Sequence, residues 1–327
     1  MRAVVTGAHG FVGPHLVAHL EAEGDQVGVI DRHGPRPVDI TDRQAVAAAL
    51  RGATVDVVYH LAGWADVGAS WSHPEETFRI NALGTLNVLE ACRRRAAPLP
   101  LLFTSTNKVY GGLDDVSLVR QGDRYLPENA KVRAHGISER RPLDFHSPYG
   151  CSKGSADQYV LDYARCFRLP AVVFRMSCIY GPHQCGNEDQ GWVAHFVRQA
   201  LQERPITFYG DGRQVRDLLF VEDLVDAMRA AIQNVKLVAG RAFNVGGGPA
   251  NAASLWDVTR QIARLHEHQP EIEFGQWRPG DQRYYVSDIR TFRRATGWRP
   301  AVGVSEGLAA LYRWLHRHET PRPSVAV

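Results

Sequence analysis

Tyr149 and Lys153 stand four residues apart, directly after Ser147-Pro148. A proline here suits the first turn of a helix, and a spacing of four places both side chains on one helical face. A phenol beside an ammonium can take a proton from a hydroxyl group when the positive charge stabilises the phenolate. One hydroxyl of Thr104-Ser105-Thr106, which follows an apolar run, can bridge the tyrosine and a substrate. The pattern therefore indicates proton transfer at an alcohol.

A glycine-rich loop, Gly7-Ala8-His9-Gly10-Phe11-Val12-Gly13, lies between the first predicted strand and the first predicted helix. Gly7 permits a tight turn, Gly10 lets a pyrophosphate approach the backbone, and Gly13 lets the helix pack close to the strand. The helix N-terminus adds free N–H groups and a partial positive charge. The loop therefore predicts a bound dinucleotide. The two signals together describe a nicotinamide enzyme that removes a proton and a hydride from the same carbinol.

The second strand ends at Asp31, eighteen residues after Gly13. A carboxylate at this position accepts both hydroxyls of the adenosine ribose and repels a 2′-phosphate, which favours NAD over NADP. Arg32 follows directly and is able to pair with a 2′-phosphate, so the residues leave that alternative open. Asp39-Ile40 lies either beside the adenine or in a surface turn.

Short apolar runs alternate with amphipathic stretches over the first 180 residues, which predicts an α/β fold of the Rossmann type, with a doubly wound parallel sheet. The predicted strands are 3–5, 27–30, 55–60, 99–103 and 171–175, and the predicted helices are 11–23, 41–51, 74–95 and 148–168. We expect residues 1–180 with 214–246 to form the NAD-binding domain, the segment 217–234 and a strand at 242–245 returning to the main sheet. Residues 181–213 with 247–318 would form a smaller substrate-binding lobe, and 319–327 a flexible tail. The polar stretch 113–145 has no clear pattern.

The balance of 38 basic and 35 acidic residues, a net charge of +3, argues against general nucleic-acid binding. Five cysteines form no CxxC pair and show no metal-ligand spacing, so we expect no metal and a reduced, cytoplasmic chain. No apolar stretch approaches the ~18 residues of a membrane span.

The chain resembles the extended short-chain dehydrogenase/reductases, a family of nucleotide-sugar epimerases and dehydratases. The resemblance covers residues 1 to about 316 and rests on TGAHGFVG (6–13), HLAG (60–63), TSTNKVYG (104–111), YGCSK (149–153) and VRD (215–217). The longer runs at 144–154, 174–182, 188–193 and 280–283 are similar to the CDP-paratose 2-epimerase branch. This resemblance implies bound NAD, a 2-keto intermediate and a homo-oligomer, with a dimer formed across helices 74–95 and 148–168 and a tetramer as the alternative.

By position, the resemblance implies the catalytic residues Thr106, Tyr149 and Lys153. The implied cofactor contacts include the glycine loop and the residues already named, which are Asp31, Arg32, Asp39, Ile40, Tyr149 and Lys153. The resemblance adds Leu61, Ala62, Gly63, Asn81, Thr104, Ser105 and Met176. The implied substrate contacts are Thr106, Asn107, Cys178, Gly191, Trp192, Tyr209, Arg216, Arg278 and Asp281. Two features depart from the pattern: the stretch from Asp31 to Asp39 is short, and Cys178 stands where many relatives have an asparagine.

Several chemistries fit one such scaffold. A 4,6-dehydratase has an acid and a base after the catalytic threonine, and here those positions are Asn107 and Lys108, which disfavours elimination of water. A dehydrogenase that oxidises beyond the aldehyde needs a nucleophile, for which only Cys151 and Cys178 lie nearby. Epimerisation requires the fewest catalytic groups. The resemblance to the CDP-paratose 2-epimerase branch implies that C2 is inverted, and general nucleotide-sugar chemistry favours C4. A non-catalytic protein that senses NAD would not need the tyrosine–lysine pair.

Overall fold

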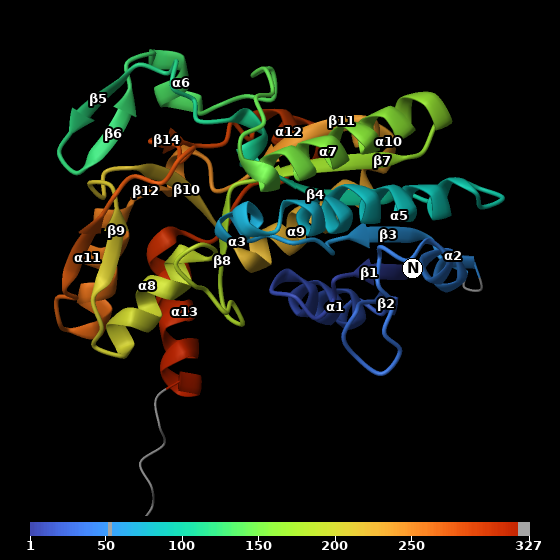
Figure 1. Cartoon of the computed structure of the whole chain (residues 1–327), viewed down its shortest axis with the longest axis horizontal. Coiled ribbons are helices and arrows are strands. Elements are labelled where there is room, and N and C mark those ends of the chain that lie inside the picture. The colour runs from blue at the N-terminus through green and yellow to red at the C-terminus, as the bar shows by residue number, and fades with distance from the viewer. Residues whose placement is uncertain (52–53, 320–327) are drawn as a thin grey trace, which may run out of the picture.

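Six parallel strands form the main sheet of the computed structural model, which describes residues 1–51 and 54–319 (Figure 1). Each strand pairs with its neighbours in parallel register. Their order is β2 (Gln26–Ile30), β1 (Arg2–Thr6), β3 (Val57–His60), β4 (Leu101–Thr106), β7 (Ala171–Met176) and β11 (Arg241–Val245). Because parallel strands need crossover connections, helices cover both faces, and the predicted Rossmann-type α/β fold is confirmed.

The two faces of the main sheet bury separate apolar cores. Val4 and Val5 are neighbours on β1 but enter opposite cores, as the alternation of side chains along a strand requires. The core around Val5 is covered by α1 (Val12–Ala22), α9 (Val221–Gln233), α10 (Val235–Val238) and α12 (Arg290–Thr296). The core around Val4 is covered by α2 (Arg43–Arg51), α5 (Gly84–Arg93) and α7 (Ser147–Phe167).

The helix predicted over 74–95 is interrupted. It consists of α4 (Pro74–Phe78), a π-helical turn η1 (Arg79–Leu83) and α5, and a short helix α3 (Val67–Ser72) precedes it. A π-turn inserts an extra residue into the helical ladder and often occurs at functional sites. Here it contains the buried Asn81, whose side chain reaches both Trp64 and Ser152.

A smaller lobe adjoins the carboxyl ends of the main strands (Figure 1). Its sheet consists of β8 (Cys178–Tyr180), β10 (Val215–Phe220), β12 (Ala252–Ser254) and β14 (Tyr284–Tyr285), and a second pair is β9 (Ile206–Tyr209) with β13 (Ile272–Gly275). Its helices are α8 (Trp192–Leu201), α11 (Leu255–His266) and α13 (Val304–Glu319), with a 3-10 turn η3 (Pro249–Asn251). The expectation that 217–234 returns to the main sheet is therefore wrong for residues 217–220, because β10 pairs with β8, β12 and β14. Helix α9 and strand β11 do return to it.

The unassigned stretch 113–145 forms a docked hairpin and helix, namely β5 (Leu118–Gln121), β6 (Arg124–Pro127) and α6 (Ala130–His135). The Tyr125 N–H donates to Arg213 O at 2.9 Å, and Arg124 pairs with Asp257 at 2.6 Å. These contacts attach the hairpin to the smaller lobe. Of the predicted tail 319–327, residue 319 ends α13 and the rest lies outside the described residues.

Candidate active site

The predicted proton-transfer residues meet where β4 ends and α7 begins. Pro148 occupies the first turn of α7, and Tyr149 and Lys153 follow on one helical face, 8% and 6% exposed. Thr106 is the last residue of β4, and its hydroxyl lies near the Tyr149 phenol while accepting from the Lys108 N–H at 3.2 Å. Burial raises the pKa of Tyr149, and the Thr106 hydroxyl opposes that rise. The structure thus brings the three side chains together but does not by itself make the phenol acidic.

Lys153 lies in an apolar pocket close to the loop after β3. Its Nζ is 4.4 Å from the centroid of the Phe103 ring and 3.6 Å from the position that a Cβ on Gly63 would take. Burial lowers the pKa of Lys153 to about 7, opposed by the charge of Asp157 one turn further along α7. The ammonium is thus poorly solvated, which strengthens its interaction with any negative charge that forms nearby.

The geometry of the glycine loop fits a pyrophosphate. Gly7 has a φ of +72°, and a Cβ there would lie 2.7 Å from the Ala62 backbone N. A side chain on Gly13 would collide with the backbone of Ala8. A Cβ on Gly10 would approach only Gly7 O, at 3.3 Å, among the described residues, so this side of the loop is open. The loop is closed where it must pack and open where a ligand would approach.

Asp31 is buried at the carboxyl end of β2 and binds the glycine loop. Its Oδ2 accepts from the His9 N–H at 3.0 Å, and its Oδ1 accepts from the His33 N–H at 2.9 Å. Arg32 and Asp39 are exposed, the Arg32 Nε donating to His33 and Asp39 accepting from the Thr41 N–H. The adjacent Ile40 is buried against Gly84.

The remaining predicted cofactor residues line the carboxyl ends of β3, β4 and β7. Asn81 Oδ1 accepts from the Trp64 N–H at 2.7 Å, which holds the loop that contains Gly63. Thr104 Oγ1 donates to His60 O at 3.1 Å, whereas the buried Ser105 Oγ has no hydrogen-bond partner within the described part of the chain. The side chains that pack against the cores at this edge are Leu61, Ala62, Val12 and Met176, and Phe11 lies half-buried at the helix start. Together these residues fit a dinucleotide.

A cluster of charges is centred on Asp281. Asp281 Oδ1 accepts from Arg216 at 2.9 Å and from Lys108 Nζ at 3.0 Å. Burial alone would raise the pKa of Asp281, but the two cations outweigh it and lower that pKa to about 2. Sequence reasoning predicted Arg216 and Asp281 but missed Lys108, although it stands two residues after Thr106.

A second charged group is centred on Arg278. Its guanidinium lies 3.7 Å from the Tyr209 ring centroid, donates to Glu188 O at 2.7 Å and pairs with Asp189 at 3.1 Å. Tyr209 in turn donates to the Glu188 carboxylate at 2.5 Å. Sequence reasoning placed Tyr209 and Arg278 in the site. It gave no role to Glu188 and Asp189, although both lie in the run 188–193, which carries part of the family resemblance.

Other predicted substrate residues make neutral contacts. Asn107 Nδ2 donates to the buried Gln282 Oε1 at 2.9 Å, and Gln282 donates to Gly111 O at 2.7 Å. The Trp192 indole donates to Cys178 Sγ at 3.3 Å, directly after Gly191, whose φ is +70°. Burial raises the pKa of Cys178, which makes it a poor nucleophile. Sequence reasoning also gave no role to Gln282, although it directly follows Asp281.

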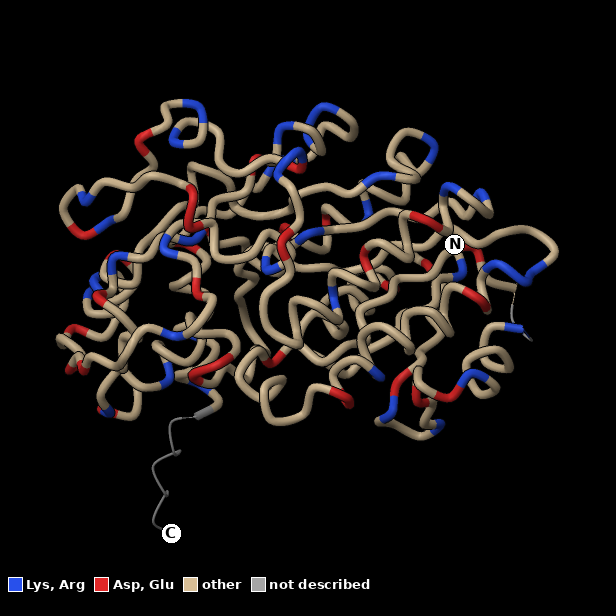
Figure 2. Tube along the Cα trace, turned by 45° about the horizontal axis from the view of Figure 1, so that its top comes forward, with Lys and Arg blue, Asp and Glu red and all other residues tan. Residues whose placement is uncertain are grey.

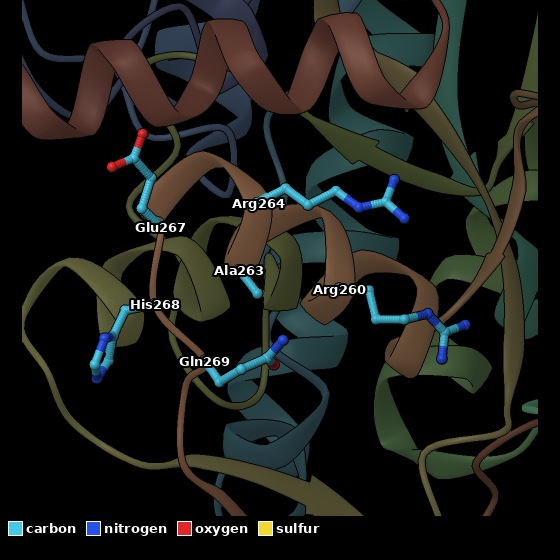
Figure 3. Close-up of a pocket in the computed structure, with 6 residues that line it drawn as sticks. All are labelled: Arg260, Ala263, Arg264, Glu267, His268 and Gln269. Atoms are coloured by element: carbon cyan, nitrogen blue, oxygen red, sulfur yellow. The ribbon is translucent and has the colours of Figure 1, made fainter.

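Other features of the surface lie away from this centre. Figure 3 shows a shallow hollow on the outer side of α11, where Arg260 and Arg264 extend in one direction and Glu267 in another. Arg260 is already paired with Asp123 and Asp257. Basic and acidic positions are interspersed over the trace (Figure 2). Within the described residues, no group of three or more His, Cys, Asp or Glu is placed to hold a metal ion, and no helix is long and apolar enough to cross a membrane.

The fold, the glycine loop and the buried tyrosine–lysine pair are typical of NAD-dependent enzymes that oxidise or reduce an alcohol carbon. The chain belongs to the NAD dependent epimerase/dehydratase family, whose model matches residues 3–246.

Full-length relatives include epimerases and dehydratases. The chain is 35% identical to the CDP-paratose 2-epimerase of Salmonella typhi, over 96% of this chain and 99% of that protein. It is 30% identical to the dTDP-glucose 4,6-dehydratase of Neisseria gonorrhoeae, over 98% and 96%. The crystal structure of the UDP-glucose 4-epimerase of Thermus thermophilus with NAD has a TM-score of 0.82 and 32% identity, covering 98% of this chain and all of that one. The prediction of an NAD-dependent nucleotide-sugar epimerase is confirmed at the level of the family.

Proposed function

We propose that this enzyme inverts C2 of a CDP-hexose through a transient ketone. The observation that carries the proposal is the absence of a free acid–base pair beside Thr106 in the described site. The following residues are an amide, Asn107, bonded to Gln282, and a cation, Lys108, bonded to Asp281. Elimination of water needs proton donors and acceptors at two carbons, whereas epimerisation needs one base. The likeness to a CDP-paratose 2-epimerase supports C2 and the cytidine nucleotide.

Tyr149 is proposed as the base that takes the proton of the sugar hydroxyl. To act near neutral pH it has to be about 4 kcal/mol easier to deprotonate than a free phenol. Since burial works in the opposite direction, the stabilisation has to come from positive charge close by. We assign that charge to Lys153 on the same helical face, together with the oxidised nicotinamide when NAD is bound. Thr106, at the end of β4, is proposed to orient the phenol. NAD, when bound, accepts the hydride from the sugar carbon and returns it to the other face.

Arg216 and Arg278 are proposed to hold the diphosphate while the sugar turns. Both guanidinium groups are already paired with carboxylates, so the substrate would replace these partners rather than meet bare charges. Asp281 would bind the ribose, Tyr209 would border the base, and Asn107, Cys178, Gly191 and Trp192 would line the sugar pocket. Binding energy placed on the diphosphate holds the substrate without restricting the reacting carbon.

We propose that NAD binds mainly to residues 1–180 with the returning segment 221–246, and that the nucleotide sugar binds mainly to 181–220 with 247–318, because β10 belongs to the smaller sheet. The glycine loop would hold the pyrophosphate. The other proposed NAD contacts are Asp31, Arg32, Asp39, Ile40, Leu61, Ala62, Gly63, Asn81, Thr104, Ser105, Tyr149, Lys153 and Met176. A cytoplasmic location stays a prediction.

A homodimer is proposed across α4, η1 and α7. Large apolar side chains are exposed there, at 56% for Phe78, 41% for Leu83 and 47% for Tyr159. Apolar side chains gathered on neighbouring helices favour association with a second copy. Light scattering of the purified protein gives the mass that tests this: a monomer would contradict it.

The alternative is inversion at C4 of a UDP-hexose, which the similarity to a UDP-glucose 4-epimerase favours. Proton NMR of CDP-paratose and of UDP-glucose, each brought to equilibrium with the enzyme and NAD, separates the two. We expect CDP-paratose to give its C2 epimer and UDP-glucose to remain unchanged. Conversion of UDP-glucose to its C4 epimer, with CDP-paratose untouched, would contradict the proposal.

A further inference from the structure

A second hollow, of about 500 Å³, lies outside the candidate active site. Its walls come from the end of α6, the loop 247–251 that follows β11, and the segments 289–293 and 299–303. It adjoins β10 on the face of the strand opposite to Arg216, the residue proposed to bind the diphosphate. Arg216 faces Asp281, whereas the next residue, Asp217, accepts from the Gly248 N–H at 2.9 Å, as alternation along a strand requires. The two sites are therefore distinct.

The charged side chains of this hollow are basic. Arg290, Arg293 and Arg299 line it together with His135, and its lining, as far as the structure describes it, contains no carboxylate. Arg290 pairs with Asp288 at 2.8 Å, whereas Arg293 and Arg299 form no ion pair within the described residues. Arg290 and Arg293 are three residues apart on α12 and so share a face. An anion in the hollow would interact favourably with Arg293 and Arg299, whereas the charge of Arg290 is already compensated by both carboxylate oxygens of Asp288.

The rest of the lining is apolar and held in place. Ile289, Pro300 and Val302 contribute hydrocarbon surface beside the arginines. The buried Asp223 of α9 fixes the segment 299–303 by accepting from the Ala301 and Val302 N–H groups, both at 2.9 Å. A rigid hollow of this size, with apolar walls and a few convergent charges, has the properties of a small-molecule site.

We propose that this hollow binds a nucleotide, with its phosphates on Arg293 and Arg299 and its planar base against the apolar wall. Arginine suits phosphate because its fork of N–H donors matches the oxygen geometry. A bare inorganic anion would use the arginines but leave the apolar wall exposed. The site goes beyond the proposed catalytic function and does not depend on which sugar carbon is inverted.

Calorimetric titration of the NAD-loaded enzyme with CDP, and separately with inorganic pyrophosphate, tests the site. We expect the wild type to bind one more CDP per chain than the Arg293→Glu/Arg299→Glu variant, and pyrophosphate to bind more weakly than CDP. In that variant the affinity of this second event should fall at least about tenfold, because two charge-assisted contacts are lost. The matched control is Arg294→Glu, an exposed arginine of the same helix that does not line the hollow; it should leave the titration unchanged.

An Arg216→Met variant distinguishes this site from the active site, since it should weaken active-site binding and leave the second event intact. Equal titrations of the wild type and the double glutamate variant would overturn the proposal. So would pyrophosphate binding as tightly as CDP, because the apolar wall would then contribute nothing. Neither result depends on whether the enzyme epimerises C2.

Discussion

Tyr149 and Lys153 are buried, and the carboxylate that acts on Lys153, Asp157, is already paired with Arg175. In contrast, Arg216, Arg278 and Lys108 lie in a group with three acidic residues, in which Arg278 and Lys108 are partly exposed. In the first region the nearest neighbours are the Phe103 ring and the Thr106 hydroxyl, and burial disfavours charge on both catalytic groups. In the second region each cation already has an anionic partner.

This difference separates two tasks. In the buried region a new charge is energetically unfavourable unless an opposite charge lies next to it. This favours paired transfer of a proton and a hydride. The charged region exchanges one set of ion pairs for another when a diphosphate arrives, so it binds without a large cost of exposing bare charges. Variants in the first region should therefore change turnover, and variants in the second should change substrate affinity.

The largest effect is expected from Tyr149→Phe, which removes the base and keeps the ring. Turnover should fall by about 10²–10⁴-fold, because a positioned proton acceptor contributes that much. The NAD content and the melting temperature should stay close to those of the wild type. Substantial turnover in this variant would end the assignment of Tyr149 as the base.

Paired lysine variants test the separation of tasks directly. Lys153→Met should lower kcat roughly a hundredfold, since it removes the charge that stabilises the phenolate. Lys108→Met should mainly raise KM, since Lys108 contacts Asp281 rather than the tyrosine. Steady-state kinetics of both variants measure the split, and equal losses of kcat would show that the two regions are not separate.

Arg278→Met should raise KM about tenfold with little change in kcat, because one charged contact with the diphosphate is lost. Arg278 is 32% exposed, so its contribution is screened by salt. The KM of the wild type should therefore rise with ionic strength more steeply than that of the variant. Parallel salt dependences would mean that Arg278 does not contact the substrate.

A further effect is a pH dependence of stability in the buried region. His60 lies between Thr6 and Thr85 under Lys153, and burial lowers its pKa from 6.5 to about 3. Below pH 6.5 the unfolded chain binds a proton that the folded chain does not, so stability should fall by up to about 1.4 kcal/mol per pH unit down to about pH 3.

Urea unfolding of the wild type and His60→Gln at about pH 6 and about pH 5 measures this loss, which the variant should largely lack. The charged region should not respond in this range. The pKa of Asp281 is lowered to about 2, so the stability that it contributes is present above its unfolded value near ~3.9 and lost only as the pH falls through about 2. Identical pH dependences of the two proteins would show that folding does not lower the pKa of His60.

What could be predicted from the sequence was local. The glycine loop, the alternation of strands and helices, and the spacing of Tyr149 and Lys153 each depend on neighbouring residues, and the structure brings those side chains together. Long-range pairings were missed: β10 joins the smaller sheet, and the hairpin at 118–127 is held by Arg213 and Asp257 from far along the chain. Lys108 and Gln282 were missed for the same reason, since their partners Asp281 and Asn107 are more than a hundred residues away.

A CDP-hexose that carries deuterium at C2 of the sugar tests the central claim of a transient ketone at that carbon. After epimerisation to equilibrium in ordinary water, NMR and mass spectrometry of the product locate the label. We predict inversion at C2 with the deuterium retained there, because the hydride leaves and returns without meeting solvent. Inversion with loss of the deuterium to water, or no inversion at C2, would contradict the account.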